Sequence, residues 1–182
     1  MRLFTAVDPT PEIVDKLADL LNRLRPSAGL RWGRAENLHL TLKFIGEFPA
    51  ERLSALEETL RAVPAPSPFE VAVRRLGFFP HARAPRVFWA GVEAPAGLAQ
   101  LAGDIDRTLE PLGIARDRRA YSPHFTLARI ADRPPLDALH RAVEALPSLE
   151  FGSFRPDRFY LYESRPGPGG SVYTRIEEFP WA

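Results

Sequence analysis

Hydrophobic and polar residues alternate with a period of two along residues 37–45. His39, Thr41 and Lys43 occupy one side of this alternation, and apolar residues occupy the other. The apolar positions are Leu38, Leu40, Leu42 and Phe44. Such a pattern predicts a β-strand that buries one face and presents the other. The rise of a strand sets the His39 and Thr41 side chains about 7 Å apart on the presented face.

The same unit returns at residues 123–130, where His124 and Thr126 repeat the His-x-Thr-apolar order. Two of the four histidines in the chain therefore begin one short motif, a coincidence expected in roughly one sequence of a hundred. A single histidine in a strand is most often a packed structural residue. The matched pair favours a shared functional role instead.

Further periodic segments predict helices and more strands around these two. Alternation predicts strands over residues 3–7, 69–73 and 87–92. Apolar residues at helical spacing predict one helix that starts at Pro11, with Thr10 as its N-cap, and ends before Pro26. A second helix is predicted over residues 51–63.

Residues 85 positions apart have the same character through much of the chain. The interval from His39 to His124 also carries residues 3–7 onto residues 88–92. The same interval separates four apolar positions of the first predicted helix from four other apolar residues. These pairs are Ile13 and Leu98, Leu17 and Ala102, Leu20 and Ile105, and Leu24 and Leu109. We interpret this as an internal duplication, roughly 1–85 and 86–182. Chance matching of apolar residues in an amphipathic protein is the alternative.

The duplication predicts a single bilobal domain over residues 1–182, of the α+β class. Two lobes face each other around a pseudo-two-fold axis, each an antiparallel sheet with helices on its outer face. The two histidine strands then lie side by side. An active-site cleft between the lobes is expected to hold the motif residues His39, Thr41, His124 and Thr126.

The amino-acid composition restricts the kinds of partner that the protein can bind. With 24 Lys and Arg against 23 Asp and Glu, the formal net charge is +1, so any contact with RNA must come from a local patch. The chain has no cysteine, which excludes disulfides and thiolate chemistry and fits a cytoplasmic protein. No apolar run is long enough for a signal peptide or a membrane span, so we expect no membrane partner.

Two imidazoles that face each other are suited to general acid–base catalysis. Because the ordinary pKa of histidine is about 6.5, one ring can take a proton from a nucleophile while the other donates one to a leaving group. Thr41 and Thr126 can donate hydrogen bonds to the non-bridging oxygens of a phosphate. Two histidines could also ligate a metal, but neither motif contains a carboxylate to complete the site. We therefore expect no metal and no cofactor.

The paired motifs, HLTL at His39 to Leu42 and HFTL at His124 to Leu127, resemble those that mark the 2H phosphoesterases. The flanks resemble the bacterial and archaeal branch called 2′-5′ RNA ligase or RNA 2′,3′-cyclic phosphodiesterase. These flanks are Arg31-Trp32, Phe79-Pro80, Arg86-Val87-Phe88-Trp89, Leu161-Tyr162-Glu163-Ser164 and Gly170-Ser171-Val172-Tyr173. The resemblance spans nearly the whole chain.

The resemblance implies metal-independent hydrolysis of RNA 2′,3′-cyclic phosphate ends to 2′-phosphates. In the family the first motif supplies the proton donor, here His39, and the second the proton acceptor, here His124. Attack by a 5′-hydroxyl instead of water implies 2′-5′ RNA ligation without ATP. The alternatives are a phosphodiesterase for another small cyclic phosphate, of the ADP-ribose type, and a non-catalytic nucleotide-binding module. We expect a monomer whose partner is RNA with a 2′,3′-cyclic phosphate end, or a cyclic nucleotide.

Three further residues are candidates for contact with substrate. Lys43 shares the strand face of the first motif's His and Thr and is predicted to face the cleft. Arg129 matches an arginine that follows the second motif in the resembling family, but the alternation puts it on the apolar face unless the strand bends or ends. Tyr121 could stack on a base or pack in the core. The run Arg116-Asp117-Arg118-Arg119 is our preferred basic patch for an RNA backbone.

The lack of carboxylates in the two motifs predicts hydrolysis without a metal ion. Exhaustive dialysis against EDTA should leave the rate of hydrolysis of a 2′,3′-cyclic nucleotide unchanged, because two imidazoles need no Lewis acid to transfer protons. Enzyme returned to Mg²⁺, Mn²⁺ or Zn²⁺ is the control. Activity that is lost in EDTA and restored by one of these ions would show that the chemistry is wrongly assigned.

Overall fold

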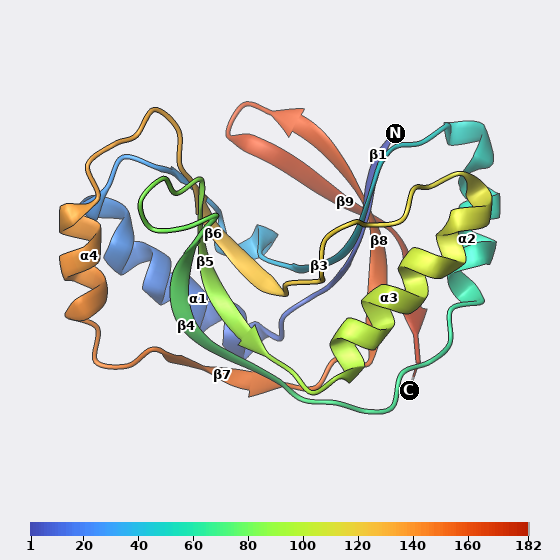
Figure 1. Ribbon diagram of the computed structural model, residues 1–182, viewed down its shortest axis with the longest axis horizontal. Coiled ribbons are helices and arrows are strands. Elements are labelled where there is room, and N and C mark those ends of the chain that lie inside the picture. Colours follow the sequence, from blue (N-terminus) through green and yellow to red (C-terminus); the bar gives the residue numbers. More distant parts are fainter. Residues whose placement is uncertain (182) are drawn as a thin grey trace.

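The computed structural model describes residues 1–181, which form two antiparallel sheets that face each other with helices outside (Figure 1). The first sheet comprises, in hydrogen-bonded order, β3 (Leu40–Glu47), β1 (Arg2–Val7), β8 (Arg158–Gly167) and β9 (Gly170–Pro180). The second comprises β2 (Arg31–Trp32), β6 (His124–Arg129), β5 (Val87–Glu93), β4 (Val71–Phe79) and β7 (Glu150–Phe154). The predicted α+β class with two lobes is confirmed.

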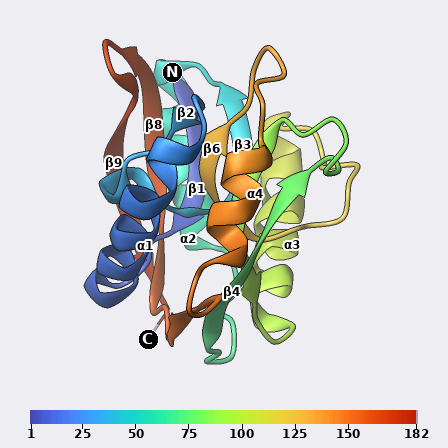
Figure 2. The ribbon, with the colours of Figure 1, turned by 90° about the vertical axis from the view of Figure 1, so that its left-hand side faces the viewer.

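Four α-helices in the described part of the chain cover the outer faces of the sheets. They are α1 (Pro11–Leu24), α2 (Leu53–Arg61), α3 (Gly97–Leu109) and α4 (Asp137–Glu144), with short 3-10 helices at Arg25–Ser27, Ala35–Asn37, Ala50–Arg52 and Glu110–Leu112. α1 contacts α4 and β7 on the second sheet, and Figure 2 shows α1 and α4 together on that side. α2 and α3 contact each other and the first sheet, through β9 and β3.

Helix α1 follows the predicted amphipathic pattern. α1 begins at Pro11 after the extended residue Thr10, the predicted N-cap, although the Thr10 side chain makes no capping hydrogen bond. The buried stripe of α1 comprises Ile13, Leu17, Leu20, Leu21 and Leu24. Among residues 1–181, no helix has the length and apolar character needed to cross a membrane.

The two halves of the sequence exchange elements between the lobes. β1 and β3 from the first half pair in one sheet with β8 and β9 from the second, whereas β4 from the first half joins β5 and β6. α1 likewise packs on the second sheet and α3 on the first. The lobes therefore do not coincide with residues 1–85 and 86–182. Elements of one type recur about 85 residues apart, as in α1 and α3, but the duplication itself stays a prediction.

β1 is buried on both faces because it lies inside the first sheet, with the main apolar core on one face and aromatic side chains on the other. Leu3 and Val7 join the main apolar core. The alternate residues of β1 join an aromatic cluster on the opposite face. That cluster comprises Phe4, Ala6 and Tyr162, with Tyr160 and Tyr173 packed against it. The inner face of the first lobe is therefore a layer of aromatic rings.

A β-bulge at Leu42 reverses the alternation of β3. Thr41 and Lys43 pair with consecutive residues of β1, so Leu42 is the extra residue of the ladder. Lys43 consequently turns toward the helices and is 2% exposed, whereas Phe44 turns to the other face and is 52% exposed. The expectations that Lys43 faces the cleft and that Phe44 is on the buried face are both wrong. The prediction extended the period of two past Leu42, the bulge residue that interrupts the alternation.

β6 has the corresponding bulge at Leu127. Thr126 and Ala128 pair with consecutive residues of β5, which makes Leu127 the extra residue. Leu127 and Ala128 are therefore both buried, although they are adjacent in the strand. Arg129 returns to the face that carries Thr126, away from the apolar core. The bend that Arg129 needs in order to leave the apolar face is thus present.

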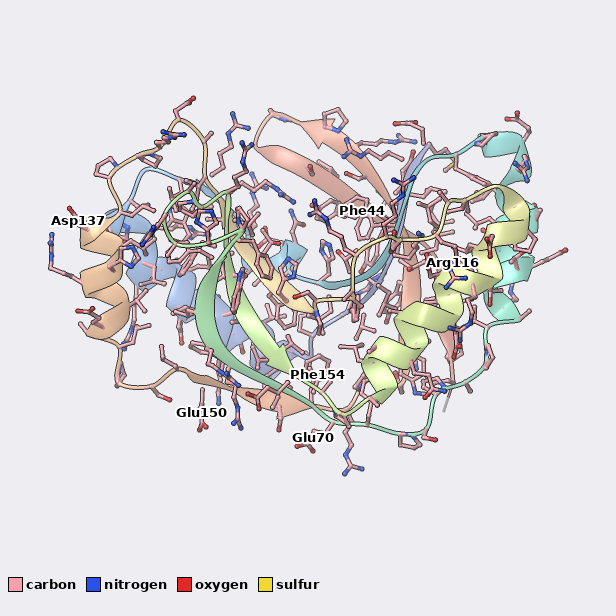
Figure 3. The ribbon with its side chains drawn as sticks, viewed as in Figure 1. Phe44, Glu70, Arg116, Asp137, Glu150 and Phe154 are labelled. Atoms are coloured by element: carbon pink, nitrogen blue, oxygen red, sulfur yellow. The ribbon has the colours of Figure 1, made fainter. Side chains whose placement is uncertain are left out.

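Lys43 is buried against α3 and the loop that leads to β6. Its Nζ donates to Asp106 at 2.7 Å, to Asp117 at 2.8 Å and to the Ala115 carbonyl at 2.7 Å. Burial by itself lowers the pKa of Lys43, but the hydrogen bonds to Asp106 and Asp117 outweigh it, so the pKa is raised. Asp106 also accepts from Arg116, which lies beside α3 in Figure 3. The network ties the first motif strand to the loop before the second.

Lys43→Met should lower the free energy of unfolding by about 3 kcal/mol, because it leaves the Asp106 carboxylate, which is largely buried, without one of its two cationic partners. Urea denaturation measures the change. Lys16→Met, at an exposed lysine of α1, is the matched control and should change stability by less than about 0.5 kcal/mol. Equal effects of the two substitutions would contradict the role given to the Lys43 network.

Candidate active site

The two motif histidines are anchored in the same way, one in each lobe. His39 Nδ1 lies 2.8 Å from the Asn37 carbonyl oxygen, and His124 Nδ1 lies 2.8 Å from the Ser122 carbonyl oxygen. Because a carbonyl oxygen can only accept, Nδ1 of each ring carries the proton of this hydrogen bond. Nε2 is then the atom of each imidazole that can gain or lose a proton.

The two imidazoles lie within electrostatic reach of each other. β3 and β6, which begin at or next to the histidines, lie side by side between the lobes in both views (Figures 1 and 2). Burial lowers the pKa of His39, and the charges of His124 and Arg129 lower it further. Burial also lowers the pKa of His124, again with a contribution from the charge of Arg129. Both rings therefore release their protons at a lower pH than a solvent-exposed histidine.

Thr41 and Thr126 lie on the inner faces of their sheets. Thr41 is opposite Ala6 of β1, and Thr126 is opposite Trp89 of β5. Each threonine follows its histidine by two residues and precedes the bulge, so its hydroxyl projects on the same side as the imidazole. The four motif residues thus lie on the faces of the two sheets that look toward each other.

Aromatic rings pack against both histidines. The His39 ring centroid is 4.8 Å from that of Phe4 and 5.2 Å from that of Tyr173, which meets it edge-on. The His124 ring meets Phe79 edge-on at 5.0 Å. These rings take water away from the imidazoles, which is the physical origin of the burial that lowers both pKa values. They also hold the orientation in which each Nδ1 reaches its carbonyl.

A groove of about 490 Å³ adjoins His39 on the first lobe. Asp8, Tyr162 and Arg175 line it and form one hydrogen-bonded cluster. The Tyr162 hydroxyl donates to Asp8 Oδ2 at 2.7 Å, and Arg175 donates through Nε to that hydroxyl at 2.9 Å and also pairs with Asp8. No motif in the sequence marked these residues, which come from opposite ends of the chain. The one sequence signal that pointed to this cluster was the Leu161-Tyr162-Glu163-Ser164 flank, which contains Tyr162.

Asp8 distinguishes the two histidines from each other. Its negative charge raises the pKa of His39 and so opposes the effect of burial. No carboxylate contributes in this way to the pKa of His124. Glu93, which lies 85 residues after Asp8, forms ion pairs with Arg74 and Arg75 instead. Asp8 therefore favours the protonated form of His39 through an interaction that His124 lacks, although the pKa of both rings is lowered.

The other residues that were predicted to contact substrate lie in different parts of the structure. Arg129 lies on the inner face of the second sheet, and its charge reaches both imidazoles. Lys43 is buried on the opposite side of β3 and cannot reach a substrate there. Tyr121 packs against the core, and its hydroxyl donates to the Thr41 carbonyl at 2.9 Å, which links the two lobes. The role of Arg116-Asp117-Arg118-Arg119 toward RNA stays a prediction.

Carboxylates and histidines are not grouped as a metal site requires. Within residues 1–181, no three His, Asp or Glu side chains come together in a way that could hold an ion. The carboxylate that acts on His39, Asp8, is already engaged by Tyr162 and Arg175. Independence from metal itself stays a prediction for the EDTA experiment.

Comparison with known proteins agrees with the geometry. The sequence model of the LigT like phosphoesterases matches the chain twice, over residues 7–89 and 91–173. An Archaeoglobus fulgidus protein named RNA 2′,3′-cyclic phosphodiesterase is 35% identical over 98% of this chain and 99% of its own length. A Methanothermobacter thermautotrophicus protein of the same name is 33% identical over 98% of both chains.

Solved structures share the bilobal fold. The crystal structure of a Thermus thermophilus protein covers 100% of this chain and 98% of its own, with a TM-score of 0.82 at 32% identity. That of E. coli LigT complexed with 3′-AMP covers 98% and 97%, with a TM-score of 0.78 at 29% identity. The fold and the paired motifs define a 2H phosphoesterase. The chain belongs to the LigT like phosphoesterase family, as the motifs predicted.

Asp8→Asn should lower the pKa of His39, because the negative charge that favours the imidazolium is removed. The pKa of His124, on which Asp8 does not act, should stay in place. NMR titration of the histidine ring protons measures both. Glu93→Gln is the matched control and should move neither pKa. A His39 titration that is the same in Asp8→Asn and in the wild-type protein would contradict the role of Asp8.

Proposed function

We propose that the protein hydrolyses the 2′,3′-cyclic phosphate at the end of an RNA chain, or on a free nucleotide, to a 2′-phosphate. The observation that carries the proposal is the matched pair of imidazoles, each fixed through Nδ1 so that Nε2 is available for proton transfer. Relatives at 31–35% identity over 98% of the chain bear the name RNA 2′,3′-cyclic phosphodiesterase, which supports the same substrate.

The reaction needs one proton acceptor and one proton donor on opposite sides of the phosphorus. His124 Nε2 takes a proton from water as the water oxygen attacks the phosphorus. His39 Nε2 gives its proton to the 3′ oxygen as the bond from phosphorus to that oxygen breaks. The bond to the 2′ oxygen survives, so the product carries a 2′-phosphate. The two rings end the turnover with exchanged protonation states, which proton exchange with solvent restores.

Charge that develops on the phosphate falls on its non-bridging oxygens. The Thr41 and Thr126 hydroxyls, one on each lobe, are suited to donate hydrogen bonds to them. The Arg129 guanidinium supplies the positive charge, since it lies close enough to lower the pKa of both imidazoles. The three donors stabilise the transition state without a metal ion.

The division of roles rests on the unequal surroundings of the two rings. Burial lowers the pKa of His39, but the negative charge of Asp8 opposes this shift and favours the protonated form that a donor requires. His124 has no such carboxylate to oppose the burial that lowers its pKa, which favours the neutral form that an acceptor requires. This assignment agrees with the order of donor and acceptor that the family resemblance implies.

The same site can join two RNA ends. When the 5′-hydroxyl of an RNA takes the place of water, its oxygen attacks the phosphorus, the bond to the 3′ oxygen breaks and a 2′-5′ linkage forms. ATP is not required, because the bond that breaks in the cyclic phosphate drives the exchange. One chain supplies both histidines, so the proposed site is complete in a monomer.

His39→Ala and His124→Ala should each slow the hydrolysis of a 2′,3′-cyclic nucleotide by about 10²–10⁴-fold, the usual contribution of a positioned acid or base. The double variant should lose far less than the product of the two single effects, because the pair acts as a unit. His140→Ala, at an exposed histidine of α4, is the control and should retain full activity. Phosphorus NMR of the product distinguishes the 2′-phosphate from the 3′-phosphate.

A substrate with a better leaving group separates the two roles. A p-nitrophenyl phosphodiester needs no proton donor, so it should restore much of the activity of His39→Ala and little of that of His124→Ala. Equal rescue of both variants, or rescue of His124→Ala alone, would contradict the assignment. A wild-type protein that binds cyclic nucleotides without turnover would instead be a nucleotide-binding module.

A further inference from the structure

Two arginines lie directly opposite each other on neighbouring strands of the second sheet. Arg31 of β2 pairs in register with Arg129 of β6, and both are exposed. Partners in an antiparallel ladder project on the same face, with Cβ atoms about 4.5–5.5 Å apart. Trp32, the other residue of β2, projects on the opposite face, where its ring meets Phe88 of the core edge-on. Arg31 therefore shares the inner face with Arg129.

This arrangement is unfavourable in the absence of an anion. Like charges directly opposite each other destabilise a sheet, and among residues 1–181 neither arginine forms an ion pair with a carboxylate. Within residues 1–181, nine other arginines do have such partners, so an unpaired arginine is not the rule in this protein. The guanidinium fork suits the oxygens of a phosphate. The pair is thus built for an anion that comes from outside the protein.

The pair is continuous with the catalytic cleft. Arg129 acts on the pKa values of both imidazoles, so its charge lies next to the reacting groups. Arg31 lies one strand further out, which is about 4.8 Å in the hydrogen-bonding direction of a sheet. The segment after β2 meets the β8–β9 turn of the first lobe, where Asn37 Nδ2 donates to the Ser171 carbonyl at 3.3 Å. The segment that follows β2 therefore borders the first lobe.

We propose that Arg31 binds the phosphodiester that precedes the reactive end of an RNA chain. This inference rests on the proposed function, in which Arg129 serves the cyclic phosphate itself. RNA places its phosphates in series, and two adjacent guanidinium groups match two successive phosphates. Arg31 then makes the site prefer an oligoribonucleotide, or a cyclic nucleotide with a 5′-phosphate, over a cyclic nucleotide that has no other phosphate.

Three substrates test the proposal with wild-type protein and Arg31→Gln. They are a 2′,3′-cyclic nucleoside monophosphate, the same nucleotide with a 5′-phosphate, and a short oligoribonucleotide with a 2′,3′-cyclic phosphate end. For wild type, KM should fall when the second phosphate is present. Arg31→Gln should raise KM by about 10-fold for the two substrates with a second phosphate, and leave the first substrate unchanged. For each of the three substrates, kcat should be the same in Arg31→Gln as in the wild-type protein.

Salt dependence and stability give independent readouts. Loss of one phosphate contact should reduce the slope of log kcat/KM against log salt concentration by about 0.7 for the oligoribonucleotide. Removal of the repulsion from Arg129 should leave the Tm of Arg31→Gln equal to or above that of wild type. Arg23→Gln, at an exposed arginine of α1 without an ion pair in the described chain, is the matched control and should change none of these quantities.

An equal rise in KM for all three substrates would overturn the proposal, since Arg31 would then act at the reactive phosphate. A second phosphate without effect on wild type would overturn it as well. Failure of the proposed function has a different signature, in which wild type turns over none of the substrates. In that case the Kd values of the same three compounds, measured by calorimetry on wild type and Arg31→Gln, decide the question for Arg31.

Discussion

The β-bulges at Leu42 and Leu127 decide which side chains of the motif strands lie on the faces that the two sheets turn toward each other. Up to each bulge, the strand presents its histidine and threonine inward in strict alternation. After it, the faces are exchanged, so that a lysine is buried in the first strand and Arg129 is brought inward in the second. The extra residue that follows each motif threonine therefore sets the charge beside the imidazoles. It also frees Lys43 to hold the loop before β6 in place.

Two similar lobes nevertheless supply two unlike chemical environments. Two residues after the bulge, the first lobe presents the exposed ring of Phe44 and the second, 85 residues later, presents Arg129. Beside the histidines, Asp8 faces inward, whereas Glu93 is held by two arginines on its own sheet. Such a difference in surroundings favours protonation of one ring over the other, which gives acid–base catalysis a preferred direction of proton transfer.

The fold and the centre of the site could be predicted because they rest on local patterns. His39 and Thr41 are two residues apart, and no bulge intervenes between them, so the period of two places both correctly. The same rule failed at Lys43 because a bulge depends on the pairing with β1, which the motif does not contain. Asp8 and Arg175 meet only because β1 and β9 both flank β8, and sheet order is a property of the whole chain. The 85-residue interval likewise indicates that elements recur, but not that the lobes exchange them.

That exchange has a consequence for how the protein is made. β1 needs β8 as its second neighbour, and nearly the entire chain separates them. A ribosome that adds 5–20 residues per second takes roughly 8–30 s to travel that distance. During this time one edge of β1 has no partner, and an open strand edge can pair with another chain. The N-terminal segment is thus most vulnerable to aggregation while it is still attached to the ribosome, and that risk ends only when almost the last strand has emerged.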